Sequence, residues 1–236
     1  MNLGIDGRHA LVVGASRGIG MEIARELFSE GCKITAVARS MPQVNGWECY
    51  PIDMTPTDAP QYLQHMMGKR TPDIIVHVLG GSQGITSTLA PASDWIKVWR
   101  LNLGIAHDLN RLFLPVLQCN KWGRIIHLSS NATRIGTGYA PYTSAKAALE
   151  GYVKSVSREF SKDGVIVTAV APGIVHTEGR YYARLDSKEQ EAYFNKYIPT
   201  HRFGRAEEVA KVVAFLASEH AAYMAGSIVQ IDGGAR

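Results

Sequence analysis

The chain has few of the features that mark secreted, metal-binding or membrane proteins. Its 236 residues include only three cysteines, none of them in a Cys-x-x-Cys pair, so we expect neither a disulfide framework nor a metal site. No segment approaches the roughly 20 apolar residues that a membrane-spanning helix needs. The first residues lack a long apolar run, so we expect no signal peptide. These absences predict a cytoplasmic protein with reduced thiols.

An excess of charge of one sign is also missing. The formal net charge is only +4, and lysine and arginine are scattered along the chain, which disfavours nucleic acid or a membrane surface as a partner. The apolar and charged fractions are those of an ordinary globular protein. A chain of this length fits one α/β domain, so we predict a single domain over residues 1–236.

The order of the apolar segments predicts the fold. Short apolar runs alternate with longer amphipathic stretches, which is typical of parallel strands covered by helices on both faces. We predict a Rossmann-like, doubly wound α/β sheet of about seven parallel strands flanked by helices. The predicted strands span 10–13, 34–38, 49–52, 74–78, 125–128, 166–171 and 228–231, and the predicted helices span 21–30, 95–117, 142–161 and 206–218. Residues 39–50 are too short and turn-rich for a full crossover helix.

A glycine-rich turn separates the first predicted strand from the first predicted helix. Glycine permits a tight turn and a close approach of the backbone to a diphosphate, and the helix N-terminus attracts phosphate. Glycines also occur in ordinary strand–helix turns, but the strand–turn–helix context favours dinucleotide binding. The residues that we expect to contact the cofactor here are Gly14, Ser16, Arg17, Gly18, Ile19 and Gly20.

Two arginines predict which dinucleotide is bound. The second predicted strand ends in Ala38-Arg39, where an NAD-binding protein of this fold has an acidic residue for the ribose 2′-OH. Arg17 lies inside the glycine turn, and guanidinium groups suit phosphate recognition. Either arginine alone is more typical of a plain surface residue. Together they predict NADPH/NADP+ in preference to NADH.

Tyr142 and Lys146 are four residues apart in a predicted helix, so they share a face. A free tyrosine has a pKa of about 10, and a nearby ammonium group lowers it. A general acid works best with a pKa near the operating pH. Each residue alone has a structural explanation, as an interfacial aromatic or a solvated lysine, but the pair favours acid–base catalysis.

With these segments in place, the chain resembles the short-chain dehydrogenase/reductase family, in its compact single-domain form, over nearly its whole length. It is similar to the family's members that reduce 3-oxoacyl groups on a carrier protein. Besides the glycine turn and the Tyr142/Lys146 pair, the marks are Asp53, Asn102, Ser129-Ser130, 172–177, 205–209 and 232–234. The resemblance implies an NADPH-dependent reductase that transfers a hydride to a substrate ketone.

The resemblance also implies a role for each site residue. Tyr142 is implied as the proton donor to the carbonyl oxygen, and Lys146 as the residue that binds the nicotinamide ribose. Ser130 is implied to hydrogen-bond the substrate oxygen, and Asn102 to hold a proton-relay water. Further implied cofactor contacts are Asp53 at the adenine, Gly80, Pro172, Gly173, Ile174 and Thr177.

Departures from the family pattern leave several points open. The family commonly uses the second serine of such a pair, yet here Ser129 has the usual spacing from Tyr142. We predict Ser130, on the assumption that one residue is missing within 137–141. His77 replaces a family asparagine, and we expect it to support its strand. Asp53 is explained equally well as a turn former before Thr55-Pro56.

Substrate and assembly are less constrained. Residues 178–202 lie where the family places its substrate-covering lid, although a solvated pair of helices explains their charges as well. Lys121, Arg124 and Lys162 are candidates for basic residues near the mouth of a site that takes carrier-bound chains. The resemblance implies a homotetramer or homodimer built through the helices that hold Asn102 and Tyr142 and through the C-terminal strand.

Two other functions remain open at this point. One is an NAD(P)-dependent alcohol or sugar dehydrogenase that works in the oxidative direction, against which Ala38 and Arg39 argue. The other is a catalytically silent, nucleotide-binding interaction protein, because a fold alone does not settle function. The Tyr142/Lys146 pair argues against silence, since a protein that only binds has no need of it.

Overall fold

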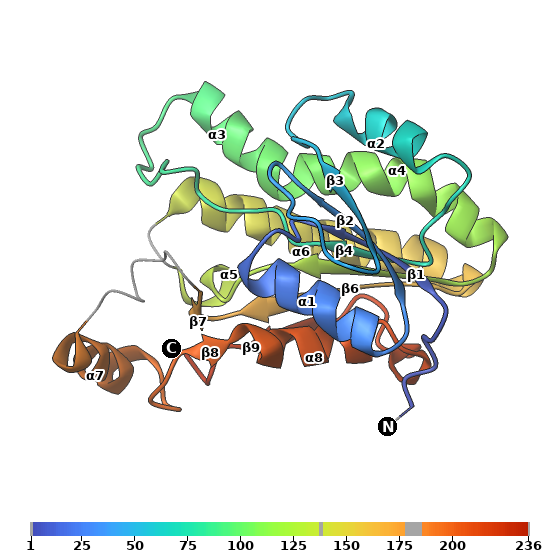
Figure 1. Cartoon of the computed structure of the whole chain (residues 1–236). Coiled ribbons are helices and arrows are strands. Elements are labelled where there is room, and N and C mark those ends of the chain that lie inside the picture. Colours follow the sequence, from blue (N-terminus) through green and yellow to red (C-terminus); the bar gives the residue numbers. More distant parts are fainter. Residues whose placement is uncertain (1, 137–138, 178–185, 236) are drawn as a thin grey trace.

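Seven strands pair in parallel to form one sheet, in the order β3-β2-β1-β4-β5-β6-β9 (Figure 1). The structure is a computed structural model that describes residues 2–136, 139–177 and 186–235. The strands are β1 (His9–Val13), β2 (Lys33–Ala38), β3 (Trp47–Pro51), β4 (Ile74–His77), β5 (Gly123–Leu128), β6 (Val165–Pro172) and β9 (Ile228–Ile231). The predicted Rossmann-like α/β fold is therefore confirmed.

Helices cover both faces of this sheet. One face packs against α1 (Gly18–Ser29) and α8 (Ala206–Leu216), and the other packs against α2 (Ala59–Met67), α4 (Ile105–Cys119) and α6 (Ala140–Phe160). Figure 1 shows α1 and α8 on one side of the sheet and α2 and α4 on the other. The strands are apolar on both faces because neither face meets solvent.

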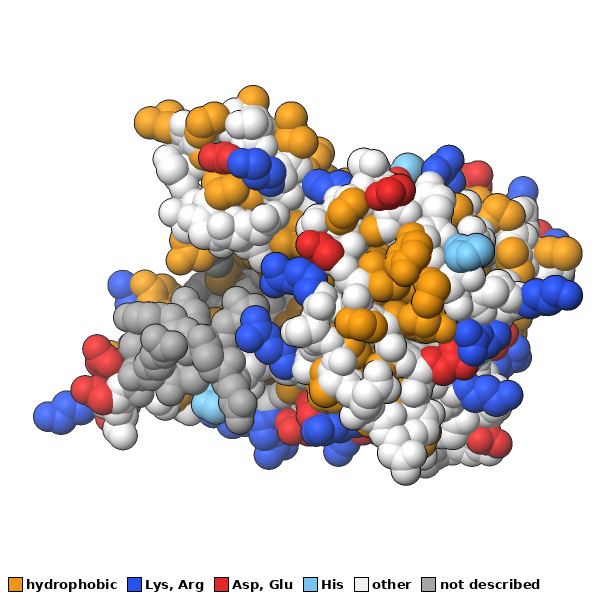
Figure 2. All heavy atoms as spheres, turned by 45° about the horizontal axis from the view of Figure 1, so that its top comes forward, with side chains coloured by type: hydrophobic (Ala, Val, Ile, Leu, Met, Phe, Trp, Pro, Cys, Tyr) orange, Lys and Arg blue, Asp and Glu red, His pale blue; other side chains and the backbone are white. Residues whose placement is uncertain are grey.

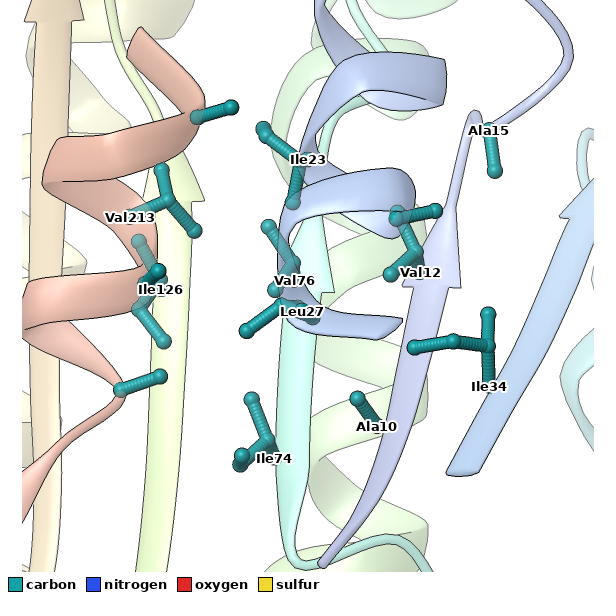
Figure 3. Packing of buried hydrophobic residues seen from close by; sticks show 14 of the residues in the cluster. Ala10, Val12, Ala15, Ile23, Leu27, Ile34, Ile74, Val76, Ile126 and Val213 are labelled. Carbon is teal, nitrogen blue, oxygen red and sulfur yellow. The ribbon is translucent and has the colours of Figure 1, made fainter. Parts of the chain in front are cut away.

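Side chains alternate between the two cores along each strand. In β1, Val12 belongs to the cluster beneath α1 and α8, whereas Leu11 and Val13 belong to the cluster beneath α2, α4 and α6. Figure 3 shows Ile23 of α1 and Val213 of α8 among the strand residues of the first cluster. Both clusters are buried, so the sheet is a rigid base for the segments that leave its ends.

Most of the predicted elements are observed, with ends shifted by a few residues. No helix lies between Ala38 and Trp47, as predicted for this short connection. The helix predicted over 95–117 is wrong as one continuous element, because α3 (Ala92–Trp99) and α4 are separated by a π-helical turn, η1 (Arg100–Gly104). Sequence analysis also missed α2 and the short α5 (Ala132–Ile135).

The remaining elements are short. They are the 3-10 turns η2 (Ser161–Asp163) and η4 (Glu219–Ala221), the paired strands β7 (Val175–His176) and β8 (Gly204–Arg205), and the helix α7 (Ser187–Tyr197). Cys32, Cys49 and Cys119 are free thiols, of which Cys32 is buried. Within the three described stretches of chain, no helix combines the length and the apolar character that crossing a membrane requires.

Candidate functional site

Residues predicted to bind or react follow the carboxyl ends of five strands. The glycine turn follows β1, Arg39 follows β2, Gly80 follows β4 and Ser129-Ser130 follow β5, while Pro172 ends β6. Because the strands are parallel, these ends lie along the same edge of the sheet. The strand order reverses between β1 and β4, and ligands of open α/β sheets bind at this kind of switch point.

The glycine turn is packed tightly at its glycine positions. Gly14 has φ +102°, a conformation that favours glycine, and its N–H donates to the Val37 carbonyl at 2.7 Å. A Cβ on Gly20 would lie 2.1 Å from the Gly14 carbonyl oxygen. A Cβ on Gly18 would lie 3.1 Å from Cγ2 of Thr177, so the segment after β6 reaches over the turn, as its predicted role requires.

The start of α1 fits a phosphate group. Arg17, the capping residue just before α1, provides no side-chain hydrogen bond to the first turn, and the leading N–H groups of a helix form an anion site. Arg17 and Arg39 are both exposed at this edge. A turn with no room for a Cβ at Gly20, a helix N-terminus and two exposed guanidinium groups together fit a phosphorylated dinucleotide.

Asp53 forms a local turn. Its Oδ1 accepts hydrogen bonds from the backbone N–H and the hydroxyl of Thr55, both at 2.9 Å. This contact is the turn-forming alternative that the sequence left open. Contact of the exposed Asp53 with adenine stays a prediction.

Lys146 is the buried charge of the site. Its side chain is 2% exposed, and its Nζ donates to the Leu128 carbonyl at 2.6 Å. The Nζ atom lies 5.9 Å from the centre of the Tyr142 ring. Burial lowers the pKa of Lys146 from 10.5 to about 7, and the nearby Glu150 carboxylate opposes that shift. The sequence-predicted pair is therefore together, with the lysine desolvated.

Asn102 lies in the π-helical turn, and its side chain makes three hydrogen bonds. Its Nδ2 donates to the carbonyls of Val98 and Gly81 at 2.8 and 2.9 Å, and its Oδ1 accepts the Gly81 N–H at 3.0 Å. The Val98 carbonyl is the one that would receive the Asn102 N–H in a regular α-helix. The side chain therefore satisfies an acceptor at the wider turn, and π-helical turns of this kind are frequent at functional sites.

The polar ends of Asn102 and Lys146 both lie beside the backbone of Gly80. A Cβ at Gly80 would lie 2.7 Å from Oδ1 of Asn102 and 2.9 Å from Nζ of Lys146. Both polar atoms therefore border the backbone that leaves β4. The absence of a side chain here is what lets the two groups approach.

The two serines differ in their partners. Ser129 is buried, and its hydroxyl donates to Oε1 of Glu150 at 2.6 Å. The Ser130 hydroxyl is partly exposed and accepts the Ala132 N–H at 3.2 Å. In the part of the chain that the structure describes, no acceptor takes the Ser130 proton, so this hydroxyl is able to donate to a substrate oxygen. These contacts support Ser130 over Ser129.

His77 lies in the core beneath the site. Its Nε2 is 2.8 Å from Oδ1 of Asn110, and its ring stacks on His127 with 4.6 Å between centroids. Burial lowers the pKa of His77 to about 4 and that of His127 well below its usual value. Both rings are thus neutral at neutral pH. The prediction that His77 supports its strand is confirmed, while its partners Asn110 and His127 had no signal in the sequence.

The basic residues suggested for the mouth of the site lie at the opposite edge of the sheet. Lys121 and Arg124 are at the amino end of β5, and Lys162 precedes the amino end of β6. Arg124 is buried and donates to the Ser218 carbonyl and to Glu219. Lys121 pairs with Asp163 at 2.6 Å. The prediction that these residues border the mouth of the site was therefore wrong. It considered their charge but not the direction of the strands beside which they lie.

Part of the predicted lid is described. Within 178–202, the residues 178–185 lie outside the described ones, and so do 137–138 within the segment 137–141. In α7, Tyr193 and Phe194 both pack against Phe203, and Tyr193 contacts Tyr197 with 4.9 Å between ring centroids. Among the residues that are described, no group of His, Cys, Asp and Glu is arranged to hold a metal ion.

Comparison with known proteins gives a consistent result. A family model described as enoyl-(acyl carrier protein) reductase matches residues 14–236. The chain is 34% identical over 248 residues to the 3-oxoacyl-[acyl-carrier-protein] reductase of Pseudomonas aeruginosa, and the match covers 98% of each chain. It is 33% identical over 244 residues to that of Escherichia coli, again with 98% of each chain covered.

Two solved structures are also similar over nearly the whole chain. A 3-oxoacyl-(acyl-carrier-protein) reductase from Agrobacterium tumefaciens with NADP bound has a TM-score of 0.90 and 28% identity, covering 98% of this chain and 95% of that one. The L-sorbose reductase from Gluconobacter frateurii complexed with NADPH and L-sorbose has a TM-score of 0.88 and 27% identity, covering 99% and 98%.

Burial of Lys146 predicts a pH dependence of stability. Its pKa is about 7 in the folded protein, against 10.5 for a solvated lysine such as that of the unfolded chain, so between these values the unfolded chain binds the extra proton. The free energy of unfolding should then rise with pH, by up to about 1.4 kcal/mol per unit from this group. Urea unfolding of the wild type and Lys146→Met at pH 7, 8 and 9 measures the difference.

Lys154→Met, on an exposed position of the same helix, is the matched control and should keep the wild-type slope. Parallel pH curves for the wild type and Lys146→Met would show that the ammonium is not desolvated in the folded protein.

Proposed function

We propose that this chain, which belongs to the short-chain dehydrogenase/reductase family and is an NADP-dependent enzyme, uses NADPH to reduce the ketone of a small-molecule substrate. The observation that carries the proposal is the desolvated ammonium of Lys146 between Tyr142 and Asn102. A group with this environment has a perturbed pKa, which is typical of catalytic sites.

NADPH, when bound, supplies the hydride that the carbonyl carbon accepts. In the proposed mechanism, Tyr142 donates its phenolic proton to the carbonyl oxygen as charge develops there. The ammonium of Lys146 stabilises the phenolate that remains. The hydroxyl of Ser130 donates a hydrogen bond to the same substrate oxygen, and Asn102 holds the water that returns a proton to the site.

The chain's own residues provide the proposed cofactor contacts. The glycine turn and the N-terminus of α1 hold the diphosphate, and Arg17 and Arg39 hold the 2′-phosphate. Thr177, which lies over Gly18, and the backbone of Ile174 hold the carboxamide. An oxidative NAD-dependent enzyme is less well supported, because Ala38 stands where the acid for a free 2′-OH is expected.

For the substrate we propose a 3-oxoacyl thioester as the first candidate, because the curated relatives at 33–34% identity are named for that chemistry. A ketose is the second candidate, since the L-sorbose reductase is similar over 99% of this chain. A silent nucleotide-binding protein is disfavoured, because burying an ammonium ion costs free energy that simple binding does not require.

We also propose that the enzyme is a homodimer or homotetramer. Trp95, Ile96, Trp99 and Leu103 line an apolar hollow of about 910 Å³ that reaches Tyr152 of α6. Ile96 is 68% exposed, and hydrophobic side chains gather at the surface over the helices at the top of Figure 1 (Figure 2). A contiguous apolar surface of this kind is typical of a protein–protein interface.

Replacing the proposed proton donor tests the catalytic role. Tyr142→Phe keeps the ring and removes the proton, so we expect ketone reduction to fall by about 10²–10⁴-fold while NADPH binding, followed by fluorescence, is unchanged. Tyr62→Phe, on the exposed face of α2, is the control and should keep full activity. Unchanged turnover in Tyr142→Phe would remove this residue as the acid.

Cofactor preference tests Arg39. In Arg39→Ala we expect NADPH affinity to fall about 10- to 100-fold, the effect of losing a charged hydrogen bond to phosphate, with NADH affinity unchanged. Parallel fluorescence titrations at one salt concentration measure both. Arg25→Ala removes a guanidinium from the exposed side of α1 and should alter neither. Equal weakening of both cofactors by Arg39→Ala would contradict recognition of the 2′-phosphate.

Assembly is tested by placing a charge in the apolar hollow. The wild type should sediment as a multiple of 25.8 kDa, and Ile96→Asp should shift it toward the monomer because a carboxylate would be buried at the interface. Tyr62→Asp on α2 is the control and should leave the mass unchanged. A monomeric wild type, or an Ile96→Asp protein of wild-type mass, argues against this interface.

A further inference from the structure

Glu150 ties both sides of the Ser130 turn to α6. Its Oε1 accepts the hydroxyl proton of Ser129 at 2.6 Å. It also lies 2.8 Å from the hydroxyl oxygen of Thr133, whose one proton is shared between this carboxylate and the Ser130 carbonyl at 2.9 Å. Ser129 directly follows β5 and Thr133 lies in α5, so the two donors are on either side of Ser130 in the chain. Hydrogen bonds from hydroxyl groups to a carboxylate are short and strong. One carboxylate oxygen therefore fixes the turn that presents the Ser130 hydroxyl.

A second attachment comes from the same helix. Nζ of Lys146 donates to the carbonyl of Leu128, the residue just before Ser129. Tyr142, Lys146 and Glu150 follow one another at intervals of four residues in α6, so they lie along one helix face. Three hydrogen bonds thus join that face to residues 128, 129 and 133. Tyr142 lies one turn before Lys146, which makes the first of these bonds.

Glu150 is also the charged partner of Lys146. Burial lowers the pKa of Lys146 to about 7, and the Glu150 carboxylate is the group that acts against this shift. The other titratable groups that face Lys146 are Tyr142 on its own helix and His127 on β5, with His77 of β4 stacked behind His127. Both histidines are buried with lowered pKa values, so they are neutral and add no charge beside Lys146.

We propose that Glu150 is a positioning residue of this site: it sets the placement of the Ser130 hydroxyl relative to Tyr142 and supplies a negative charge that favours the ammonium form of Lys146. This inference rests on the proposed reductase function. The Glu150 side chain then has two effects. An anchoring effect acts through the hydroxyl groups of Ser129 and Thr133, and an electrostatic effect acts through Lys146. Neither effect requires Glu150 to touch the substrate or the cofactor.

Two sets of variants separate the effects. Glu150→Gln keeps an acceptor oxygen for Ser129 and Thr133 but removes the charge. The double variant Ser129→Ala with Thr133→Val keeps the charge and removes both hydroxyl donors. Thr133→Val alone is its control, because this change also removes the contact of Thr133 with the Ser130 carbonyl. Circular dichroism and thermal unfolding check that each protein is folded, and the double variant tests the anchoring effect even where Glu150→Gln is unstable.

The electrostatic effect is measured by the pH dependence of NADPH binding, in the absence of a substrate. Lys146 as an ammonium ion donates to the ribose in the proposed function, so NADPH affinity should fall as pH rises through the pKa of Lys146. Without the Glu150 charge that pKa is lower, so the midpoint of the fall in Glu150→Gln should move down by about one pH unit. The double variant should keep the wild-type midpoint. An unmoved midpoint in Glu150→Gln overturns the electrostatic effect.

The anchoring effect is read from kcat. In the double variant we expect kcat for ketone reduction to fall about 10- to 100-fold, because a small displacement of the Ser130 hydroxyl misplaces a group that acts on the reacting oxygen. NADPH affinity should stay at the wild-type value. A wild-type kcat in the double variant overturns the anchoring effect. A wild type that reduces no ketone contradicts the reductase function, whereas a shifted binding midpoint in Glu150→Gln still supports the charge on Lys146.

Discussion

The burial of one positive charge organises this site. An ammonium ion taken out of water costs several kcal/mol unless hydrogen bonds and an opposite charge compensate. Lys146 receives this compensation from the Leu128 carbonyl and from Glu150. Its neighbour Gly80 has no side chain that would displace the Nζ atom. This side chain thus ties the helix α6 to the end of β5 and lies beside the backbone that follows β4.

Parallel topology explains why residues so far apart in the chain meet there. Every strand of the main sheet runs in the same direction, so all the loops at the carboxyl ends share one edge. The switch in strand order between β1 and β4 places the glycine turn beside the Gly80 loop, and a Cβ on Gly14 would lie 3.2 Å from the Leu79 backbone. The same rule puts Lys121 and Arg124 at the other edge, away from the reacting groups.

The shared fold does not set the substrate. Two similar structures, at nearly equal TM-scores, are a 3-oxoacyl-(acyl-carrier-protein) reductase and an L-sorbose reductase. Their substrates differ in size and polarity although both are ketones, as expected when loops rather than the scaffold carry specificity. In this chain α7 contacts Phe203 through Tyr193 and Phe194, outside the segments that hold Tyr142 and Lys146.

The sequence by itself determined the strands, the glycine turn and the Tyr142/Lys146 pair, because these follow from local periodicity and from the spacing of one helix turn. Only the tertiary structure distinguishes the contacts of Ser129 from those of Ser130, since they depend on where Glu150 lies. The tertiary structure also shows that the helix predicted over 95–117 is interrupted at η1, where the side chain of Asn102 hydrogen-bonds to Gly81. Local geometry depends on residues that are neighbours in the sequence. The partner of a buried polar group depends instead on which distant elements the sheet brings together.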